Sequence, residues 1–262
     1  MDTDAGRMQD EIAIVTGSNS GLGRAIARRF AAEGARVVVT GRNTERGEAM
    51  VKSLAGLPGE SVFLPADLSD ENACQGLVAS CVEHFGGLSV LVNNAVSGAV
   101  SPRQTAVETL ATETWEQVFR VTLTAAMWMC RAAIPHMRTA GGGSIINVSS
   151  RAAERATPGL PAYVAAKGGM NALTRSIATD YAADGIRCNT LAPGYVINEV
   201  REVLSEERRA HFERMHLTRI PIADDIAAAA AFLASRDAEV ITGVLLPVDG
   251  GSSTAARAAA FG

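Results

Sequence analysis

Short apolar stretches rich in valine and isoleucine alternate along this chain with longer segments rich in alanine and charged residues. Few polar residues interrupt the apolar stretches. Such runs predict strands, and their almost continuous apolar character is typical of strands that helices cover on both faces. The predicted strands occupy residues 12–16, 36–40, 61–66, 88–94, 143–150, 186–192 and 243–251.

The segments between these stretches have the length and alanine content of helices. They occupy residues 21–34, 45–56, 71–85, 114–137, 162–183 and 224–235. Because strands and helices alternate, the pattern predicts an α/β fold, a doubly wound parallel sheet of seven strands with helices on both faces. No linker rich in proline, glycine or serine divides the chain. We therefore expect a single domain over residues 1–262, with a core at 10–251 and a C-terminal tail at 252–262.

Composition and charge narrow the functional classes. The chain has 262 residues, of which 47% are hydrophobic and 20% charged, and its formal net charge is −4. The net charge is negative, and lysine and arginine are scattered along the sequence. The chain therefore lacks the clustered positive charge that a nucleic-acid-binding surface needs. Residues 1–10 lack the apolar core of a secretory signal, and the apolar run 226–234 is too short to span a bilayer. We expect a cytoplasmic protein with no membrane partner.

The residues that commonly bind metals show no metal-ligand spacing. The four cysteines form no Cys-x-x-Cys pair, and no His-Glu-x-x-His motif is present. Free cysteines are commonly buried. We therefore expect four buried thiols and no metal site.

A glycine-rich turn, TGSNSGLG, directly follows the first predicted strand and opens the first predicted helix. Glycines at such a turn let the backbone approach a pyrophosphate, and the helix N-terminus supplies N–H donors. The spacing is Gly-x-x-x-Gly-x-Gly rather than the commoner Gly-x-Gly-x-x-Gly. The turn predicts a dinucleotide site, and a tight turn without a ligand is the alternative. The candidate residues are Gly17, Ser18, Asn19, Ser20, Gly21, Leu22 and Gly23.

The end of the second predicted strand bears on the choice of cofactor. An NAD site usually has an acidic residue there to bind the ribose hydroxyls. Here the chain has Arg42, whose guanidinium can bind a 2′-phosphate bidentately. This favours NADP(H) over NAD(H), although NAD(H) is possible if Arg42 only stacks on the adenine or is solvated.

Tyr163 and Lys167 lie four residues apart in a predicted helix, after a strand that ends in Ser149 and Ser150. A free phenol has a pKa of ~10, and an ammonium on the same helix face lowers it by favouring the phenolate. Such a phenol can exchange a proton with an alcohol near neutral pH, while a serine hydroxyl binds the carbonyl oxygen. A simple surface pair is the alternative.

These motifs together resemble the short-chain dehydrogenase/reductase family from about residue 11 to 251. The resemblance rests on TGSNSGLG, ADLSD (66–70), NNA (93–95), INVSS (146–150), YVAAK (163–167), IRCNTLAPG (186–194) and ITGVLLPVDGG (241–251). It implies a Rossmann-like domain that transfers a hydride between NADP(H), or NAD(H), and a ketone or secondary alcohol. It also implies a homotetramer or homodimer.

The resemblance assigns roles position by position. Tyr163 would be the general acid/base, Lys167 its partner and a ribose ligand, and Ser150, thirteen residues before the tyrosine, the catalytic serine rather than Ser149. The remaining cofactor contacts would come from Asp67 and Leu68 at the adenine, Asn94 and Ala95 near the second ribose, and Pro193, Gly194 and Val196 at the nicotinamide. The four-residue spacing of Tyr163 and Lys167 disfavours the enoyl reductase branch, in which it is usually wider.

Three positions depart from the family pattern. Val96 replaces a glycine, Asn198 replaces a threonine, and Thr122 replaces the asparagine that helps to position water in a proton relay. We hypothesise that Thr122 fills that catalytic role in part. Its hydroxyl can bond to the Val118 carbonyl and bend the helix, and either the hydroxyl or a neighbouring carbonyl freed by the bend would hold the relay water near Lys167. The departures leave open a cofactor-binding scaffold or sensor, but the retained Ser150, Tyr163 and Lys167 favour an enzyme.

The sequence does not identify the substrate beyond a small carbonyl or alcohol. Residues 195–220 are predicted to form a helical lid, and their five arginines are balanced by five glutamates, which argues against a strongly anion-attracting mouth. Position alone makes four residues candidates for the substrate pocket: Val96, Arg151, Tyr195 and Met215.

Overall fold

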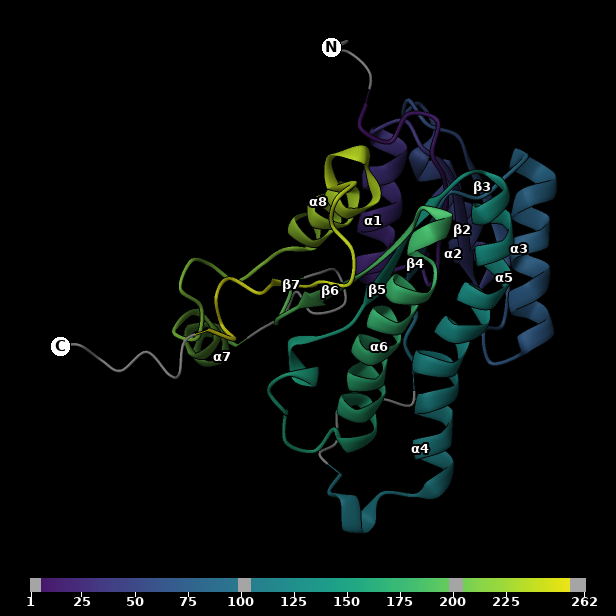
Figure 1. The fold of residues 1–262 in the computed structure, drawn as a ribbon. Helices are drawn as coiled ribbons and strands as arrows, with labels where there is room; N and C mark the ends of the chain where they lie inside the picture. The colour runs from purple at the N-terminus through teal and green to yellow at the C-terminus, as the bar shows by residue number, and fades with distance from the viewer. Residues whose placement is uncertain (1–5, 99–104, 198–204, 255–262) are drawn as a thin grey trace.

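The computed structural model describes residues 6–98, 105–197 and 205–254, and a sheet of seven strands runs through its centre (Figure 1). The strand order is β3-β2-β1-β4-β5-β6-β7, and every neighbouring pair is parallel. The predicted parallel sheet is confirmed. Its strands are β1 (Ile12–Val15), β2 (Arg36–Gly41), β3 (Ser61–Pro65), β4 (Val90–Asn93), β5 (Gly143–Val148), β6 (Ile186–Pro193) and β7 (Leu245–Val248).

The direction of strand order reverses between β1 and β4. From β1 the chain proceeds outward through β2 to β3, whereas β4 lies on the other side of β1 and the later strands continue away from it. Connections that diverge in this way open a crevice at the carboxyl ends of the strands. Val15 pairs with Val92, so the segments that follow β1 and β4 reach the same edge of the sheet.

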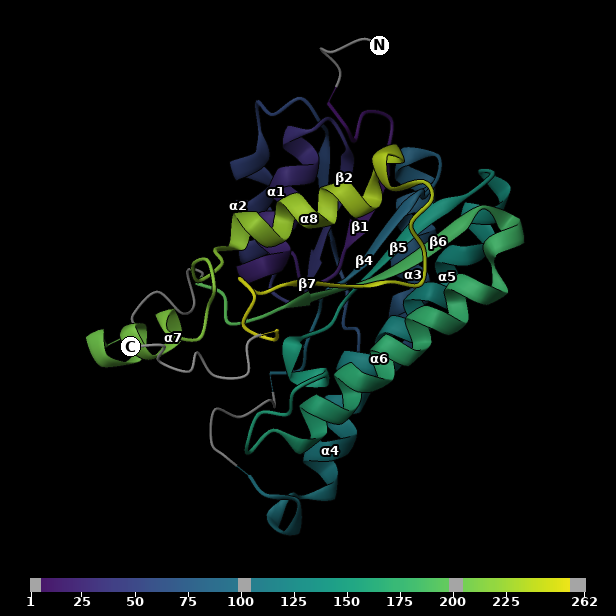
Figure 2. The same cartoon turned by 60° about the vertical axis from the view of Figure 1, so that its left-hand side comes forward.

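Helices cover both faces of the sheet (Figure 2). One face packs against α1 (Gly21–Ala32), α2 (Thr44–Leu54) and α8 (Ala223–Ala234). The other packs against α3 (Glu71–Phe85), α5 (Ala125–Thr139) and α6 (Pro161–Asp180). The two further helices are α4 (Thr112–Phe119) and α7 (Glu206–Glu213).

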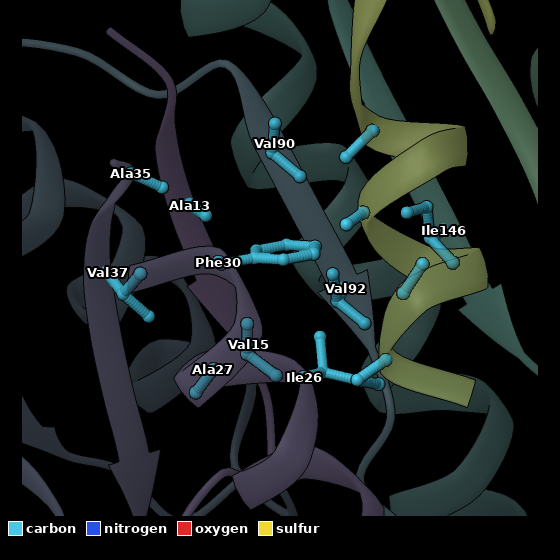
Figure 3. Close-up of a cluster of buried hydrophobic side chains, with 14 of the residues drawn as sticks. Ala13, Val15, Ile26, Ala27, Phe30, Ala35, Val37, Val90, Val92 and Ile146 are labelled. Atoms are coloured by element: carbon cyan, nitrogen blue, oxygen red, sulfur yellow. The ribbon is translucent and has the colours of Figure 1, made fainter. Parts of the chain in front are cut away.

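The two faces follow from alternation along each strand. In β1, Ala13 and Val15 belong to the core under α1 and α8, whereas Ile12 and Ile14 belong to the core under α3 and α5. Figure 3 shows the first core, in which Phe30 of α1 reaches across to the valines of β4. Its ring is fully buried, and truncating such a ring to alanine costs about 3–5 kcal/mol.

The helix predicted over 114–137 is interrupted. α4 ends at Phe119, a π-helical turn occupies Arg120–Thr124, and α5 continues to Thr139. A π-turn shifts the pattern of backbone hydrogen bonds, and such turns are frequent at functional sites. The interruption therefore falls on the stretch that contains Thr122.

The predicted lid lies partly outside the described residues, because 198–204 are not described. The described remainder includes α7. Across the described ranges, no helix is long and apolar enough to cross a bilayer. The four cysteines are buried and unpaired, as predicted. Among the described residues, no group of three or more potential metal ligands lies together.

Candidate active site

A cleft of about 1290 Å³ lies at the carboxyl edge of the sheet. It is larger than the ~300–1,000 Å³ of a pocket for one drug-sized ligand, and thus offers room for a dinucleotide and a second molecule. Its lining comes from the segments that follow β1, β2, β3, β4, β5 and β6. The sheet therefore brings together motifs that lie far apart in the sequence.

The glycine-rich turn forms one wall of this cleft. Gly17 and Gly21 have φ angles of 65° and 55°, which favour glycine. A Cβ on Gly23 would lie 2.4 Å from the Gly17 carbonyl oxygen, so Gly23 lets α1 start close against the turn. The turn thus presents backbone and the N-terminus of α1 to the cleft, which fits a pyrophosphate.

Ser18 and Gly23 support the turn rather than line the cleft, whereas the other five predicted residues of the turn line it. The Ser18 hydroxyl is buried and accepts a hydrogen bond from the Thr40 backbone N–H at 2.9 Å. This bond ties the turn to the end of β2. Sequence reasoning placed Ser18 at the cofactor because it could not show which way the side chain points.

Asn94 fixes the turn from the other side. Its side-chain amide donates to the Thr16 carbonyl at 2.8 Å, and its backbone N–H donates to the Thr16 hydroxyl at 2.8 Å. That hydroxyl also accepts from the Ala95 backbone N–H. Thr16 therefore connects the ends of β1 and β4. The sequence did not predict this role, although Thr16 is the first residue of the TGSNSGLG motif.

Arg42 lies at one end of the cleft with Asp67 and Leu68. The Ser69 backbone and hydroxyl donate to the Asp67 carboxylate, and these bonds, with a smaller contribution from the Arg42 charge, lower the pKa of Asp67. Arg46, in the first turn of α2, also lines the cleft. Arg42 precedes α2, so the spacing of four residues between the two arginines did not predict this second cation.

The two serines after β5 have different partners. The Ser149 hydroxyl is buried and donates to the Lys167 backbone carbonyl at 3.1 Å. The Ser150 oxygen accepts from the Ala152 backbone N–H at 3.1 Å, which leaves its proton available to the cleft. This arrangement supports the choice of Ser150 as the donor to a substrate oxygen.

Tyr163 and Lys167 both line the cleft from α6, one turn apart. The Lys167 Nζ lies 5.9 Å from the centre of the Tyr163 ring and donates to the Val148 carbonyl at 2.5 Å. Burial lowers the pKa of Lys167 to about 7. Its charge therefore depends on pH near neutrality, which the sequence alone did not indicate.

The hydrogen bond predicted for the Thr122 hydroxyl is wrong. The buried hydroxyl accepts from the Ser97 backbone N–H at 3.4 Å, and no bond to the Val118 carbonyl is present. The helix deviates there because of the π-turn instead. Beside Thr122 is a cavity of about 10 Å³ that also reaches Asn93. Thr122 lines this cavity and not the main cleft.

The segment after β6 closes the cleft. Pro193, Gly194 and Val196, the residues predicted to contact the nicotinamide, line it. A Cβ on Gly194 would lie 2.7 Å from that of Asp249, so glycine allows the loop after β7 to pack here. Val96 takes the place of a family glycine without strain, because Asp10 is the one non-glycine residue with positive φ in the described chain. Asn198 lies outside the described residues.

Three of the four residues predicted for the substrate pocket line the cleft. Val96, Arg151 and Tyr195 line the cleft, but Met215 does not. The Tyr195 ring stacks on Phe212 of α7 with centroids 3.8 Å apart. Further lining residues that the sequence did not predict include Asn43, Gln117, Val121, Thr157, Leu160 and Phe212.

Comparison with known proteins decides the family. A family model described as Enoyl-(Acyl carrier protein) reductase matches residues 17–253. A probable short-chain type dehydrogenase/reductase of Bradyrhizobium diazoefficiens is 38% identical over 248 residues, which cover 94% of this chain and 88% of that protein. The chain belongs to the short-chain dehydrogenase/reductase family.

Further relatives define the chemistry of this short-chain dehydrogenase/reductase. A 3beta-hydroxysteroid dehydrogenase of Mediterraneibacter gnavus is 43% identical over 188 residues, 72% of this chain and 67% of the relative. A solved 7 alpha-hydroxysteroid dehydrogenase, complexed with NADH and 7-oxo glycochenodeoxycholic acid, matches with a TM-score of 0.88 and 28% identity, covering 96% of this chain and 97% of its own. The predicted Rossmann-like fold is confirmed, and the protein is an oxidoreductase of CH–OH groups.

Proposed function

We propose that this short-chain dehydrogenase/reductase transfers a hydride between NADP(H) and a ketone or secondary alcohol, with Tyr163 as the general acid/base. The observation that carries the proposal is the shared cleft: Ser150, Tyr163 and Lys167 line the same space as the glycine turn. A tyrosine–lysine pair with only a structural role on the surface would not be expected to line this cleft.

Each side chain has a distinct task in carbonyl reduction. The nicotinamide, when bound, supplies the hydride to the carbonyl carbon. The Ser150 O–H donates a hydrogen bond to the carbonyl oxygen. It is oriented for this because its own oxygen accepts a hydrogen bond from the Ala152 N–H. Tyr163 gives its phenolic proton to that oxygen, and the Lys167 ammonium stabilises the resulting phenolate. Alcohol oxidation uses the same groups in reverse.

The proposed cofactor preference rests on the charges at the adenine end. β2 ends at Gly41, and the next residue is Arg42 rather than an acidic residue. Arg46 adds a second guanidinium to the same end. Two cations favour the 2′-phosphate of NADP(H). Asp67 is the acidic residue in the described lining, and its carboxylate is already occupied by Ser69. NAD(H) is the competing cofactor, since one similar structure contains NADH.

We further propose that the protein assembles as a homotetramer or homodimer. The exposed side of α4 carries Trp115, which is 38% exposed and stacks on Phe119 with centroids 4.4 Å apart. A partly exposed aromatic pair is typical of a protein surface that contacts a partner. Light scattering on the purified protein tests the assembly directly.

The test of the activity is a direct assay with both cofactors. The purified protein is incubated with NADPH or NADH and a panel of ketones, and the absorbance of the reduced nicotinamide is followed. The proposal predicts ketone-dependent oxidation that is faster with NADPH. Absence of turnover in both directions, despite tight binding of NADPH, would instead support a cofactor-binding scaffold.

A further inference from the structure

The catalytic end of the cleft has an apolar wall beside its polar groups. Beyond Ser150 and Tyr163, the lining includes Val96, Val121 and Leu160, and the stacked rings of Tyr195 and Phe212. Apolar and aromatic walls favour a substrate with a hydrophobic body. A charged group in such a wall calls for a separate explanation, because burying an unpaired charge is costly.

Arg151 is that charged group. It follows Ser150 directly, is half-buried and lines the cleft. One of its guanidinium nitrogens donates to the Ser252 carbonyl at 3.4 Å. A guanidinium has five N–H donors, so this single long bond leaves most of them for another acceptor. Within residues 6–98, 105–197 and 205–254, no carboxylate lies within 4.0 Å of it.

Other arginines of the chain show what a structural role looks like. Arg187, also partly buried, donates to four backbone carbonyls, at Leu233, Ala234, Ser235 and Ile241. On the surface, Arg138 and Arg219 each bind an aspartate. Arg151 has neither several backbone carbonyl partners nor a bound aspartate, although it directly follows the proposed catalytic serine.

The rest of the cleft does not neutralise Arg151. The carboxylate in the described lining belongs to Asp67, at the adenine end with Arg42 and Arg46. Lys167, the other cation at the catalytic end, is bonded to the Val148 carbonyl and is fully buried. Arg151 is therefore a cation that lines the reacting end of the cleft and has no ion pair with a described carboxylate.

We propose that Arg151 binds a carboxylate of the substrate, so that the enzyme acts on hydroxy or keto acids with an apolar body. A carboxylate matches the planar guanidinium in a bidentate pair. Ser150 and Arg151 are adjacent in the chain and line the same cleft, so one substrate can contact both. This inference rests on the proposed function and names the substrate class of the same site.

The test compares each keto acid with its methyl ester, which removes the charge and keeps the carbonyl. Benzoylformate, 3-benzoylpropionate and 4-acetylbenzoate vary the spacing between carbonyl and carboxylate. We measure kcat/KM for wild type, Arg151→Gln and Arg151→Lys, with Arg155→Gln as the matched control. Arg155 lies one turn further on, is exposed and does not line the cleft. Thermal unfolding checks that the variants fold.

Wild type should prefer at least one acid over its ester by about tenfold or more, the size expected for a hydrogen bond to a charged group. Arg151→Gln should remove this preference, leave the ester within about threefold and leave NADPH affinity unchanged. Arg151→Lys should keep part of the preference, and Arg155→Gln all of it. Equal losses on acid and ester in Arg151→Gln, or no acid preference in wild type, would overturn the inference.

A binding measurement separates this inference from the proposed function. Calorimetric titration of the acids and esters into the NADPH complex does not require turnover. Arg151-dependent binding of acids without any turnover would support the carboxylate site and contradict the proposed activity. Turnover of esters with no effect of Arg151→Gln on acid binding would support the activity and overturn the carboxylate site.

Discussion

The cofactor end and the substrate end of the cleft are built in different ways. The cofactor end consists of one short turn after β1, with its glycines and backbone N–H groups, and of the residues that follow β2 and β3. The substrate end gathers Val96 after β4, Arg151 after β5, Leu160 before α6 and Phe212 from α7. The first depends on local backbone geometry, and the second on side chains that tertiary packing brings together. Changes to the two ends should therefore affect different measurable quantities.

The largest change in cofactor preference is expected from Arg42→Asp. The substitution removes the proposed 2′-phosphate ligand and adds an acceptor for ribose hydroxyls. We expect the preference to move from NADP(H) toward NAD(H) by about 2–4 kcal/mol, measured as the ratio of kcat/KM values for the two cofactors. Arg28→Asp, an exposed change of equal charge on α1, is the control. If the wild-type protein already prefers NAD(H), the proposed role of Arg42 at a 2′-phosphate is wrong.

Gly23→Ala should damage the cofactor end through packing alone. The added Cβ would lie 2.4 Å from the Gly17 carbonyl oxygen and 2.5 Å from the Asn94 amide. Overpacking of this kind costs about 1–3 kcal/mol of stability. We also expect weaker NADPH binding, measured by titration, because the turn must shift. Gly76→Ala in α3, where nothing lies within 4 Å of the new Cβ, should leave both quantities unchanged or raise stability. If the two variants behave alike, close packing at Gly23 is not what shapes the turn.

Lys167 should make stability depend on pH. Its folded pKa of about 7 lies below that of an unfolded lysine, ~10.4. Between these values the unfolded state binds more protons, so the contribution of Lys167 to stability rises with pH and is smallest below pH 7. From pH 7 to 9, wild type should gain about 1–3 kcal/mol in free energy of unfolding relative to Lys167→Met, measured with urea. An equal pH dependence of the two proteins would show that Lys167 does not titrate in this range.

The smallest effect is expected at Thr122, which lines the small cavity outside the main cleft. Thr122→Ala removes the oxygen that accepts from the Ser97 N–H, and we expect kcat to fall by about tenfold, or about 1.4 kcal/mol of barrier. Thr122→Asn should preserve or raise kcat. Thr124→Ala, in the same π-turn but away from the cleft, is the control. If Thr122→Ala matches wild type across the pH profile, Thr122 has only a packing role.

The difference between the two ends also explains what the sequence could predict. The strands, and the glycine turn at the end of β1, follow from local patterns, and the structure has them where expected. Arg46 and Phe212 were missed because their approach to the cleft depends on how helices dock. That the Ser18 hydroxyl accepts from the Thr40 N–H instead of lining the cleft could not be predicted, because the direction of a hydroxyl depends on its neighbours in the fold. The π-turn at Thr122 has no signature in residue type alone, and its hydroxyl partner, Ser97, is distant in sequence.

The most direct test of the account is the paired measurement of turnover and NADPH affinity in Tyr163→Phe. The ring keeps its place on α6 and loses only the proton that we propose it transfers. We predict that kcat falls by about 100- to 10,000-fold, the range of general acid–base catalysis, while the NADPH Kd stays within about threefold. Tyr181→Phe, at the end of α6 and away from the cleft, should match wild type. Turnover of Tyr163→Phe within about tenfold of wild type would contradict the account.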